Sequence, residues 1–423
     1  MNIMHQNFES KHVHIVGAGI SGLIAAINLE KMGFSPVIWE ENDQIGGRVQ
    51  TDFVEGYQLD RGFQVLLEAY PMAKKYLDFD ALNLQPLDSG TLIFSNGQAN
   101  FFGDPRRDIS FLFPTIFSSF ATLSDKFKIF QLNQKLNKDD VIEIFNREEH
   151  STSSYLKKLG FSSKVIHSFF IPFFSGIFLE PDLNTSSRMF EFVYKMFSEG
   201  RAMIPRAGIG AISQQLKRRL QKTEIKLNTK VAHIKNNKIF LPGNESVTSD
   251  FIIVATNPEN LINNYTSSLQ WKSCNTIYLT TPKRSFYKPI IGLNAAKDRF
   301  ANNIFYPTSI ETEGKGREEL LSVTVVKNHE LPIDRLVEVV RQELKKDFNI
   351  DQSAYLKHYN IPHALPDLKD LQYERDEGES LLTENIAIAG DFQLNGSLNA
   401  AMTSGEKAAL ITKRVLSGNL IAV

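Results

Sequence analysis

The hydrophobic pattern of the first 40 residues predicts a strand, a helix and a second strand in close succession. Residues 13–16 are apolar at Val13, Ile15 and Val16 and are followed by Gly17, which is typical of a buried parallel strand. Apolar residues at 23, 24, 27 and 29 then follow at helical spacing, and Gly33 stands where a helix C-terminus favours glycine. Residues 36–40 predict the second strand. The three elements together indicate a right-handed βαβ unit.

The rest of the chain alternates between helical and strand-like patterns, without an internal repeat or a low-complexity tract. Residues 75–204 are rich in Phe and Lys and predict a mainly helical insertion. Residues 224–241 alternate as a meander of short strands around a turn. The remaining expected elements are buried strands at 251–254 and 385–391, strands at 275–281 and 319–326, and helices at 124–137, 153–160, 332–348 and 399–416.

Composition places the chain among ordinary soluble globular proteins. Its 423 residues are too many for one small core, so two or more domains are expected. Segments of one domain can alternate along the sequence with segments of another. The 47 basic and 48 acidic residues nearly cancel to a net charge of −1, which gives no overall field to attract nucleic acid. A single cysteine, Cys274, excludes an internal disulfide framework and fits a reducing compartment.

The sequence shows no targeting or membrane-spanning segment. The N-terminus lacks a signal-peptide pattern, and no run approaches the roughly 18–20 apolar residues that span a bilayer. We therefore expect a cytoplasmic protein. The apolar stretch 111–123 predicts a packed core helix or loop. Its alternative role is a peripheral membrane contact or an apolar substrate entrance.

A glycine motif stands at the junction of the first strand and helix. Gly17 permits a tight turn, Gly19 lets the backbone approach a pyrophosphate, and Gly22 lets the helix pack closely on the strand. The helix N-terminus offers its N–H groups to that anion. Glu40 ends the second strand, 18 residues after Gly22, where a carboxylate accepts hydrogen bonds from both ribose hydroxyls. The residues assigned to this part of a dinucleotide site are Gly17, Ala18, Gly19, Ile20, Ser21, Gly22, Glu40 and Glu41.

A second glycine element, Gly46, Gly47 and Arg48, distinguishes between the dinucleotides. It resembles the G-G-R-x-x-[ST] element of the flavin amine oxidase, phytoene desaturase and protoporphyrinogen oxidase superfamily. In this interpretation Gly47 brings the backbone close to the diphosphate, and Arg48 supplies a guanidinium to it. The alternative is a Gly-Gly turn with a solvated arginine.

Three further stretches agree with this resemblance. Residues 59–66 are similar to a family segment that approaches the isoalloxazine, and Val231 matches a valine that pairs through its backbone with adenine. Residues 386–410 resemble the C-terminal flavin signature, in which a helix N-terminus stabilises the anionic reduced flavin. Ala400 replaces a glycine that is usual in relatives. The site residues that the resemblance implies here are Gly62, Phe63, Gln64, Val65, Val231, Gly390, Asp391, Ser397, Leu398 and Asn399.

The resemblance implies an α/β fold, with a Rossmann-like (GR2-type) FAD-binding domain and an interleaved α+β substrate domain that contains the helical insertion. The FAD-binding domain is expected at 1–75, 205–270 and 375–423, and the substrate-binding domain at 76–204 and 271–374. FAD is expected to be noncovalent, because Cys274 lies far along the sequence from the C-terminal signature. The implied activity is hydride transfer from a lipophilic or amine-type organic substrate to flavin N5, with reoxidation by dioxygen or another acceptor.

The sequence leaves the substrate and several alternatives open. Desaturase-like, porphyrinogen-oxidase-like and amine-oxidase-like chemistry all fit, and no local motif selects a catalytic lysine among Lys272, Lys283 and Lys288. No spacing typical of a metal site or a catalytic triad is present. A non-catalytic alternative is a lipid escort like the GDP-dissociation inhibitors, which keep the fold without FAD. A nicotinamide-only dehydrogenase is disfavoured by the second glycine element.

Overall fold

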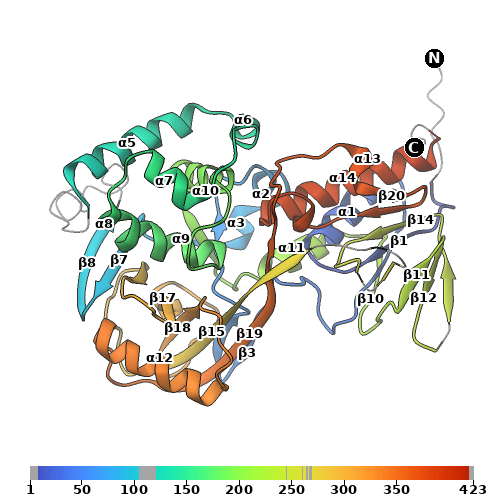
Figure 1. Cartoon of the computed structure of the whole chain (residues 1–423). Helices are drawn as coiled ribbons and strands as arrows, with labels where there is room; N and C mark the ends of the chain where they lie inside the picture. The colour runs from blue at the N-terminus through green and yellow to red at the C-terminus, as the bar shows by residue number, and fades with distance from the viewer. Residues whose placement is uncertain are drawn as a thin grey trace.

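Short apolar strands from three separate parts of the chain pair into a six-stranded sheet, in the order β10-β2-β1-β14-β21-β20 (Figure 1). The structure is a computed structural model and describes residues 8–103, 121–243, 245–259, 261–262, 265 and 269–418. Five strands are parallel and β20 pairs antiparallel at the edge. Their bounds are β1 Val13–Val16, β2 Val37–Trp39, β10 Glu224–Lys226, β14 Phe251–Val254, β20 Leu381–Thr383 and β21 Ile386–Ile388.

Both faces of this sheet are covered, because successive strand residues point to opposite sides. Ile15 and Ile253 belong to the core that includes helices α1 (Ile20–Lys31) and α14 (Leu398–Leu416). Val16 and Val254 pack instead on the antiparallel strands β11 (His233–Lys235), β12 (Lys238–Phe240) and β13 (Ser246–Thr248). The predicted βαβ unit is therefore confirmed.

A seven-stranded, largely antiparallel sheet, in the order β19-β15-β18-β17-β16-β7-β8, forms the other half of the molecule. Helix α12 (Ile333–Phe348) covers one face, while α9 (Ile171–Phe178) and α10 (Ser187–Glu199) lie on the opposite side (Figure 1). The strands are β7 Gly90–Ser95, β8 Gln98–Gly103, β15 Gln270–Thr281, β16 Ile291–Asn294, β17 Ala301–Phe305, β18 Glu319–Val325 and β19 Ala354–Asp367.

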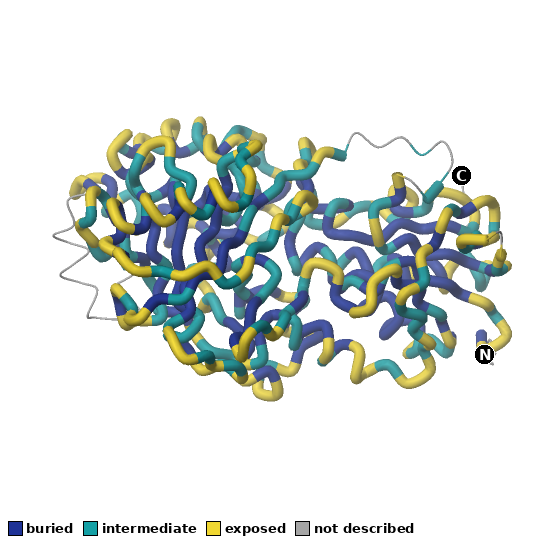
Figure 2. Tube along the Cα trace, turned by 90° about the horizontal axis from the view of Figure 1, so that it is seen from below, coloured by how far each residue is buried: buried dark blue, intermediate teal, exposed yellow. Residues whose placement is uncertain are grey.

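The remaining elements surround these two sheets, and Figure 2 shows buried segments in both halves of an elongated molecule. Their helices are α2 Pro71–Tyr76, α3 Phe79–Leu82, α5 Leu123–Lys138, α6 Val141–Phe145, α7 Thr152–Lys158, α8 Ser163–Val165, η2 Ile166–Phe170, α11 Ala211–Arg218, η3 Pro307–Ser309, α13 Glu377–Ser380 and η4 Asp391–Gln393. Their strands are β3 Thr51–Val54, β4 Tyr57–Asp60, β5 Leu66–Leu67, β6 Leu84–Pro86 and β9 Ala202–Pro205.

Two sequence predictions were wrong in part. Residues 84–103 are not helical, since β7 and β8 form a hairpin whose Asn96–Gly97 turn has φ of +50° and +74° at its two residues. An Asn-Gly pair between apolar runs is a strong hairpin signal, and the mainly helical interpretation overlooked it. In the predicted meander, β10 instead pairs parallel with β2, because its place in the sheet is decided by packing that no local pattern encodes.

The predictions of fold class, domain boundaries and membrane contact have separate outcomes. The mixed α/β class is confirmed, whereas the GR2 subtype and the domain boundaries stay predictions. Of the apolar stretch 111–123, residues 111–120 lie outside the described residues. Among the residues that the structure describes, no helix combines the length and apolar character that a membrane-spanning segment requires.

Candidate active site

A large cavity of about 1280 Å³ lies between the two sheets. One side is formed by the residues that follow the carboxyl ends of the parallel strands: Gly17 after β1, Glu40 after β2, Ala255 after β14 and Gly390 after β21. The other side comes from β15, β17, β18 and β19 of the seven-stranded sheet and from α9 and α10. The carboxyl edge of a parallel sheet is where α/β folds bind ligands.

The first glycine loop leaves one position open to the cavity. A Cβ at Gly17 (φ +105°) would lie 2.9 Å from the Ala255 carbonyl oxygen, and one at Gly22 would lie 2.1 Å from the Gly17 carbonyl oxygen. These two glycines are therefore required by the turn and by helix–strand packing. A Cβ at Gly19 would meet nothing within 4 Å, although Gly19 lines the cavity. Its bare backbone faces the space that a ligand would fill.

Glu40 is buried and holds this loop from the end of β2. Its Oε2 accepts a hydrogen bond of 2.7 Å from the Ala18 N–H. Its Oε1 accepts from the backbone N–H of Asn42 at 3.0 Å and from the Asn42 Nδ2 at 2.7 Å. Glu41 also lines the cavity, with its carboxylate 3.8 Å from Lys230 Nζ. The acid predicted from the sequence therefore fixes the backbone of the first glycine motif.

The second glycine element lies directly against the first. The Gly46 N–H donates to the Ala18 carbonyl at 2.9 Å, and Gly19 and Gly46 form an isolated parallel bridge. A Cβ at Gly47 (φ +60°) would approach the Gly19 Cα at 3.4 Å. Two motifs separated by more than 20 residues thus form one backbone surface.

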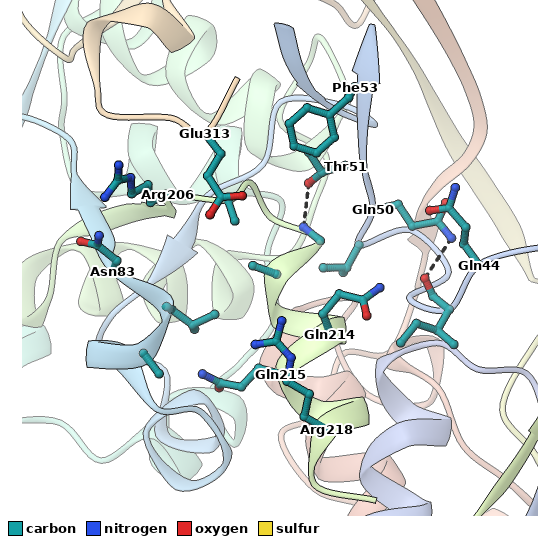
Figure 3. A pocket seen from close by; sticks show the side chains of 17 residues that line it. Gln44, Gln50, Thr51, Phe53, Asn83, Arg206, Gln214, Gln215, Arg218 and Glu313 are labelled. Carbon is teal, nitrogen blue, oxygen red and sulfur yellow. Dashed lines mark hydrogen bonds between the residues drawn. The ribbon is translucent and has the colours of Figure 1, made fainter. Parts of the chain in front are cut away.

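A second pocket, of about 530 Å³, is lined by residues that flank this element, among them Ile45, Gln50 and Thr51 (Figure 3). Gln50 Nε2 donates to the Ile45 carbonyl at 3.1 Å, and the Gly210 N–H donates to Thr51 Oγ1 at 2.8 Å. None of the residues predicted to bind the cofactor lines it. The first of these hydrogen bonds joins the two flanks of residues 46–48, and the second ties Thr51 to the N-cap residue of α11.

Arg48 joins the N-terminal region to the C-terminal region. Its Nη2 lies 2.5 Å from Asp391 Oδ1, and its Nη1 donates to the Ala364 carbonyl at 3.1 Å. The guanidinium also lies 5.5 Å from the centroid of the Trp271 ring. The side chain of Asp391 is only 6% exposed, while that of Arg48 is 40% exposed at the cavity. A cation is thereby held at the wall of the cavity.

Residues 62–65 form an adjacent part of the wall. Gly62 has φ of +100°, and a Cβ there would lie 2.9 Å from Ile361 Cδ1. Gln64 Nε2 donates to the Arg48 carbonyl at 2.9 Å, so this turn is tied to the second glycine element. The Phe63 ring packs at 5.2 Å from that of Phe305 in β17.

The C-terminal signature contributes the start of α14. Ser397 caps this helix, since its Oγ accepts from the Ala400 N–H at 3.0 Å, and both Ser397 and Leu398 line the cavity. Asn399 does not, because its Oδ1 accepts from the Met72 N–H at 3.0 Å. Val231 lines the cavity but precedes strand β11 instead of lying within it.

Most of the predicted residues are brought together at one place. Eighteen of the 21 line the cavity, the exceptions being Ala18, Gly22 and Asn399. Sequence reasoning assigned no site residue in the apolar half, which has no local motif and exists only once distant helices and strands assemble. Its residues include Phe173, Gly176, Ile177, Met189, Val193, Phe197, Thr276, Asn303 and Thr324.

A lysine and the cysteine are among the titratable side chains of this half. Lys272 Nζ lies 2.7 Å from Glu180 Oε2 and 2.9 Å from Thr185 Oγ1, whereas Lys283 and Lys288 do not line the cavity. Cys274 does line it, and burial raises the pKa of its thiol to about 12. In the described part of the chain, no three His, Cys, Asp or Glu side chains gather as a metal site would require.

Asp60 gives a prediction about pH. Burial raises its pKa to about 6, although Thr51 Oγ1 and the Ile209 N–H both donate to its Oδ1. A folded-state pKa above the unfolded value near 3.9 means that stability is lost as the pH rises through 6. D60N should therefore exceed the wild type by about 3 kcal/mol in unfolding free energy at neutral pH and match it below about pH 4. Urea unfolding across that range measures the difference, and a difference independent of pH would refute the assignment.

Comparison with known proteins gives a family match and a fold match. A family model described as flavin containing amine oxidoreductase matches residues 20–410. A 67-residue stretch is 33% identical to 4,4'-diaponeurosporene oxygenase of Staphylococcus aureus (strain USA300), which covers 16% of this chain and 14% of that protein. A 57-residue stretch is 44% identical to probable polyamine oxidase 4 of Arabidopsis thaliana, covering 14% and 12%. The matches thus span far less than two thirds of either curated relative.

A solved structure matches nearly the whole chain. The crystal structure of a putative protoporphyrinogen oxidase from Exiguobacterium sp. 255-15 superposes with a TM-score of 0.70. It covers 96% of this chain and 99% of its own at 16% identity. At that identity the likeness shows a shared fold.

Proposed function

The chain belongs to the flavin-containing amine oxidoreductase family, and on that premise we propose that it is an FAD-dependent oxidoreductase. The proposal rests on the observation that both glycine motifs and the C-terminal signature line the same cavity. Gly19 presents bare backbone to this cavity, and Gly47 lies beside it. Such a surface suits a diphosphate, which needs close main-chain approach.

We assign the parts of the ligand to the residues that line each part of the wall. Glu40 and Val231 hold the adenosine end, because they stand at the carboxyl edge of β2 and just before β11. Gly19, Gly47 and the Arg48 guanidinium hold the diphosphate. Leu398 and residues 62–65 hold the isoalloxazine, with the N-terminus of α14 supplying positive partial charge.

FAD supplies a two-electron acceptor for a hydride from the substrate carbon. The protein's contribution is to orient the substrate and to exclude water. Phe173 and Phe197 from the helical layer provide an apolar wall for this purpose. A neighbouring apolar cavity of about 370 Å³ shares both of these residues and Ile291. This extended apolar surface favours a lipophilic substrate.

The cofactor is proposed to be noncovalent. Cys274 is the sole cysteine of the chain and lines the cavity, but the raised pKa of its thiol keeps it protonated at neutral pH. A protonated thiol is a poor nucleophile, so thioether formation with the flavin is disfavoured. Acid precipitation of the purified protein should therefore release all the flavin into the supernatant.

The activity is tested by anaerobic mixing of the purified yellow protein with amines, carotenoids and porphyrinogens. A substrate is identified by loss of the oxidised-flavin absorption, and admission of dioxygen or an artificial acceptor should restore it. A yellow protein that no member of these classes reduces would contradict the proposed substrate range. A colourless protein that FAD cannot reconstitute would instead favour the escort-like alternative.

A further inference from the structure

Three polar side chains form a row across the seven-stranded sheet, facing the large cavity. Thr276 of β15 is directly opposite Thr324 of β18, and Thr324 is opposite Asn303 of β17. All three line the cavity and are almost fully buried, at 0%, 5% and 5% exposure. The strand register thus places two hydroxyls and an amide side by side in an otherwise apolar region.

The hydrogen bonds of this row leave the hydroxyl protons of Thr276 and Thr324 available to a ligand. Asn303 Nδ2 donates to Thr324 Oγ1 at 3.2 Å, and Asn303 Oδ1 accepts from Asn302 Nδ2 at 3.1 Å. Thr324 acts there as an acceptor, so its hydroxyl proton remains free to donate. Thr276 Oγ1 is buried with no hydrogen-bond partner among the described residues. A buried hydroxyl without a partner costs free energy, which a ligand atom in the cavity would recover.

The carboxylates of the cavity do not offer a site for a substrate cation. Each carboxylate that lines the cavity among the described residues has a partner: Glu40, Glu41, Asp52, Asp367 and Asp391. Lys272, on the same strand as Thr276, is paired with Glu180. A substrate ammonium beside Thr276 would therefore lose its hydration without gaining a counter-ion.

We propose that Thr276, Thr324 and Asn303 bind a neutral oxygen acceptor, a carbonyl or hydroxyl, on a substrate whose remaining surface is apolar. This inference rests on the proposed function, because it assigns the row to the substrate side of the same cavity. The two hydroxyls donate to the substrate oxygen, while Asn303 holds Thr324 in place. The apolar side chains of α9 and α10 contact the apolar remainder of the substrate. The row selects neutral oxygenated substrates over ammonium ions of the same shape.

Calorimetric titration of the holoprotein with three probes of one carbon skeleton tests this. The probes are benzylacetone, the primary ammonium analogue in which CH–NH₃⁺ replaces its carbonyl, and butylbenzene. Benzylacetone should bind the wild type more tightly than either of the others. T276V should raise the Kd for benzylacetone about fivefold and leave that for butylbenzene unchanged, since one neutral hydrogen bond is removed. T276S keeps the hydroxyl and should retain wild-type affinity.

The matched control is T280V, the same change on the same strand at a residue that does not line the cavity. Equal benzylacetone affinity in T276V and T280V would overturn the proposal, as would the absence of benzylacetone binding. Tighter binding or oxidation of the ammonium probe would overturn it as well. Flavin content is measured on each preparation, so that a colourless wild type signals failure of the proposed function. If the protein is yellow but T276V binds benzylacetone as tightly as the wild type, only the proposed role of the three polar side chains fails.

Discussion

G19E is expected to purify as a folded protein without flavin. A Cβ at this position meets no protein atom within 4 Å, so a side chain can project into the cavity and leave the packing of the loop intact. Its carboxylate would lie beside the proposed diphosphate, and like charges about 4 Å apart repel by several kcal/mol in a partly buried site. The affinity for FAD should therefore fall at least about 100-fold, equivalent to ~2.7 kcal/mol.

Flavin absorbance per protein and the Kd for added FAD measure this effect. The matched control is G378E, because Gly378 is exposed, does not line the cavity and likewise has nothing within 4 Å of its Cβ position. G378E should retain stoichiometric flavin, and both variants should keep the circular dichroism of the wild type. Stoichiometric FAD in G19E would mean that the diphosphate binds elsewhere.

G405V is expected to have the largest effect on stability. A Cβ at Gly405 of α14 would lie 2.2 Å from the Ser21 carbonyl oxygen of α1, which is backbone and cannot rotate away. The two helices would have to separate, and both carry residues of the proposed cofactor site. Overpacking of this kind costs about 3 kcal/mol, or a fall in Tm of roughly 3–4 °C for a chain of 423 residues.

Thermal unfolding of G405V and of the exposed control G378V tests the packing. G378V should leave Tm within about 1 °C of the wild type, as surface substitutions usually do. A G405V protein with wild-type Tm and wild-type flavin content would show that the backbones of α1 and α14 leave room for a side chain at position 405.

The residues of the proposed cofactor half could be listed from the sequence because that half is built from local motifs. Gly17, Gly19 and Gly22 stand at fixed spacing between a strand and a helix, and the turn they imply depends on backbone conformation alone. Glu40 was expected to contact the ribose. The structure adds that its Oε2 accepts from the Ala18 N–H, a contact that only the folded loop reveals.

Contacts between distant segments could not be predicted in the same way. Arg48 and Asp391 were each assigned to the cofactor, but nothing in either motif indicates that they form an ion pair. Cys274 was thought remote from the C-terminal signature, yet it lines the same cavity, because distance along the chain says little about distance in space. The row that contains Thr276 depends on the register of three strands, which is fixed by packing across the whole sheet.

The most direct test of the central claim is the electron density in the cavity of the purified, yellow protein. One FAD molecule should extend from Glu40, past Gly19, Gly47 and Arg48, to Gln64 and Leu398, without a bond to Cys274. A cavity filled by protein side chains, or a cofactor that contacts only one of the two glycine motifs, would contradict it.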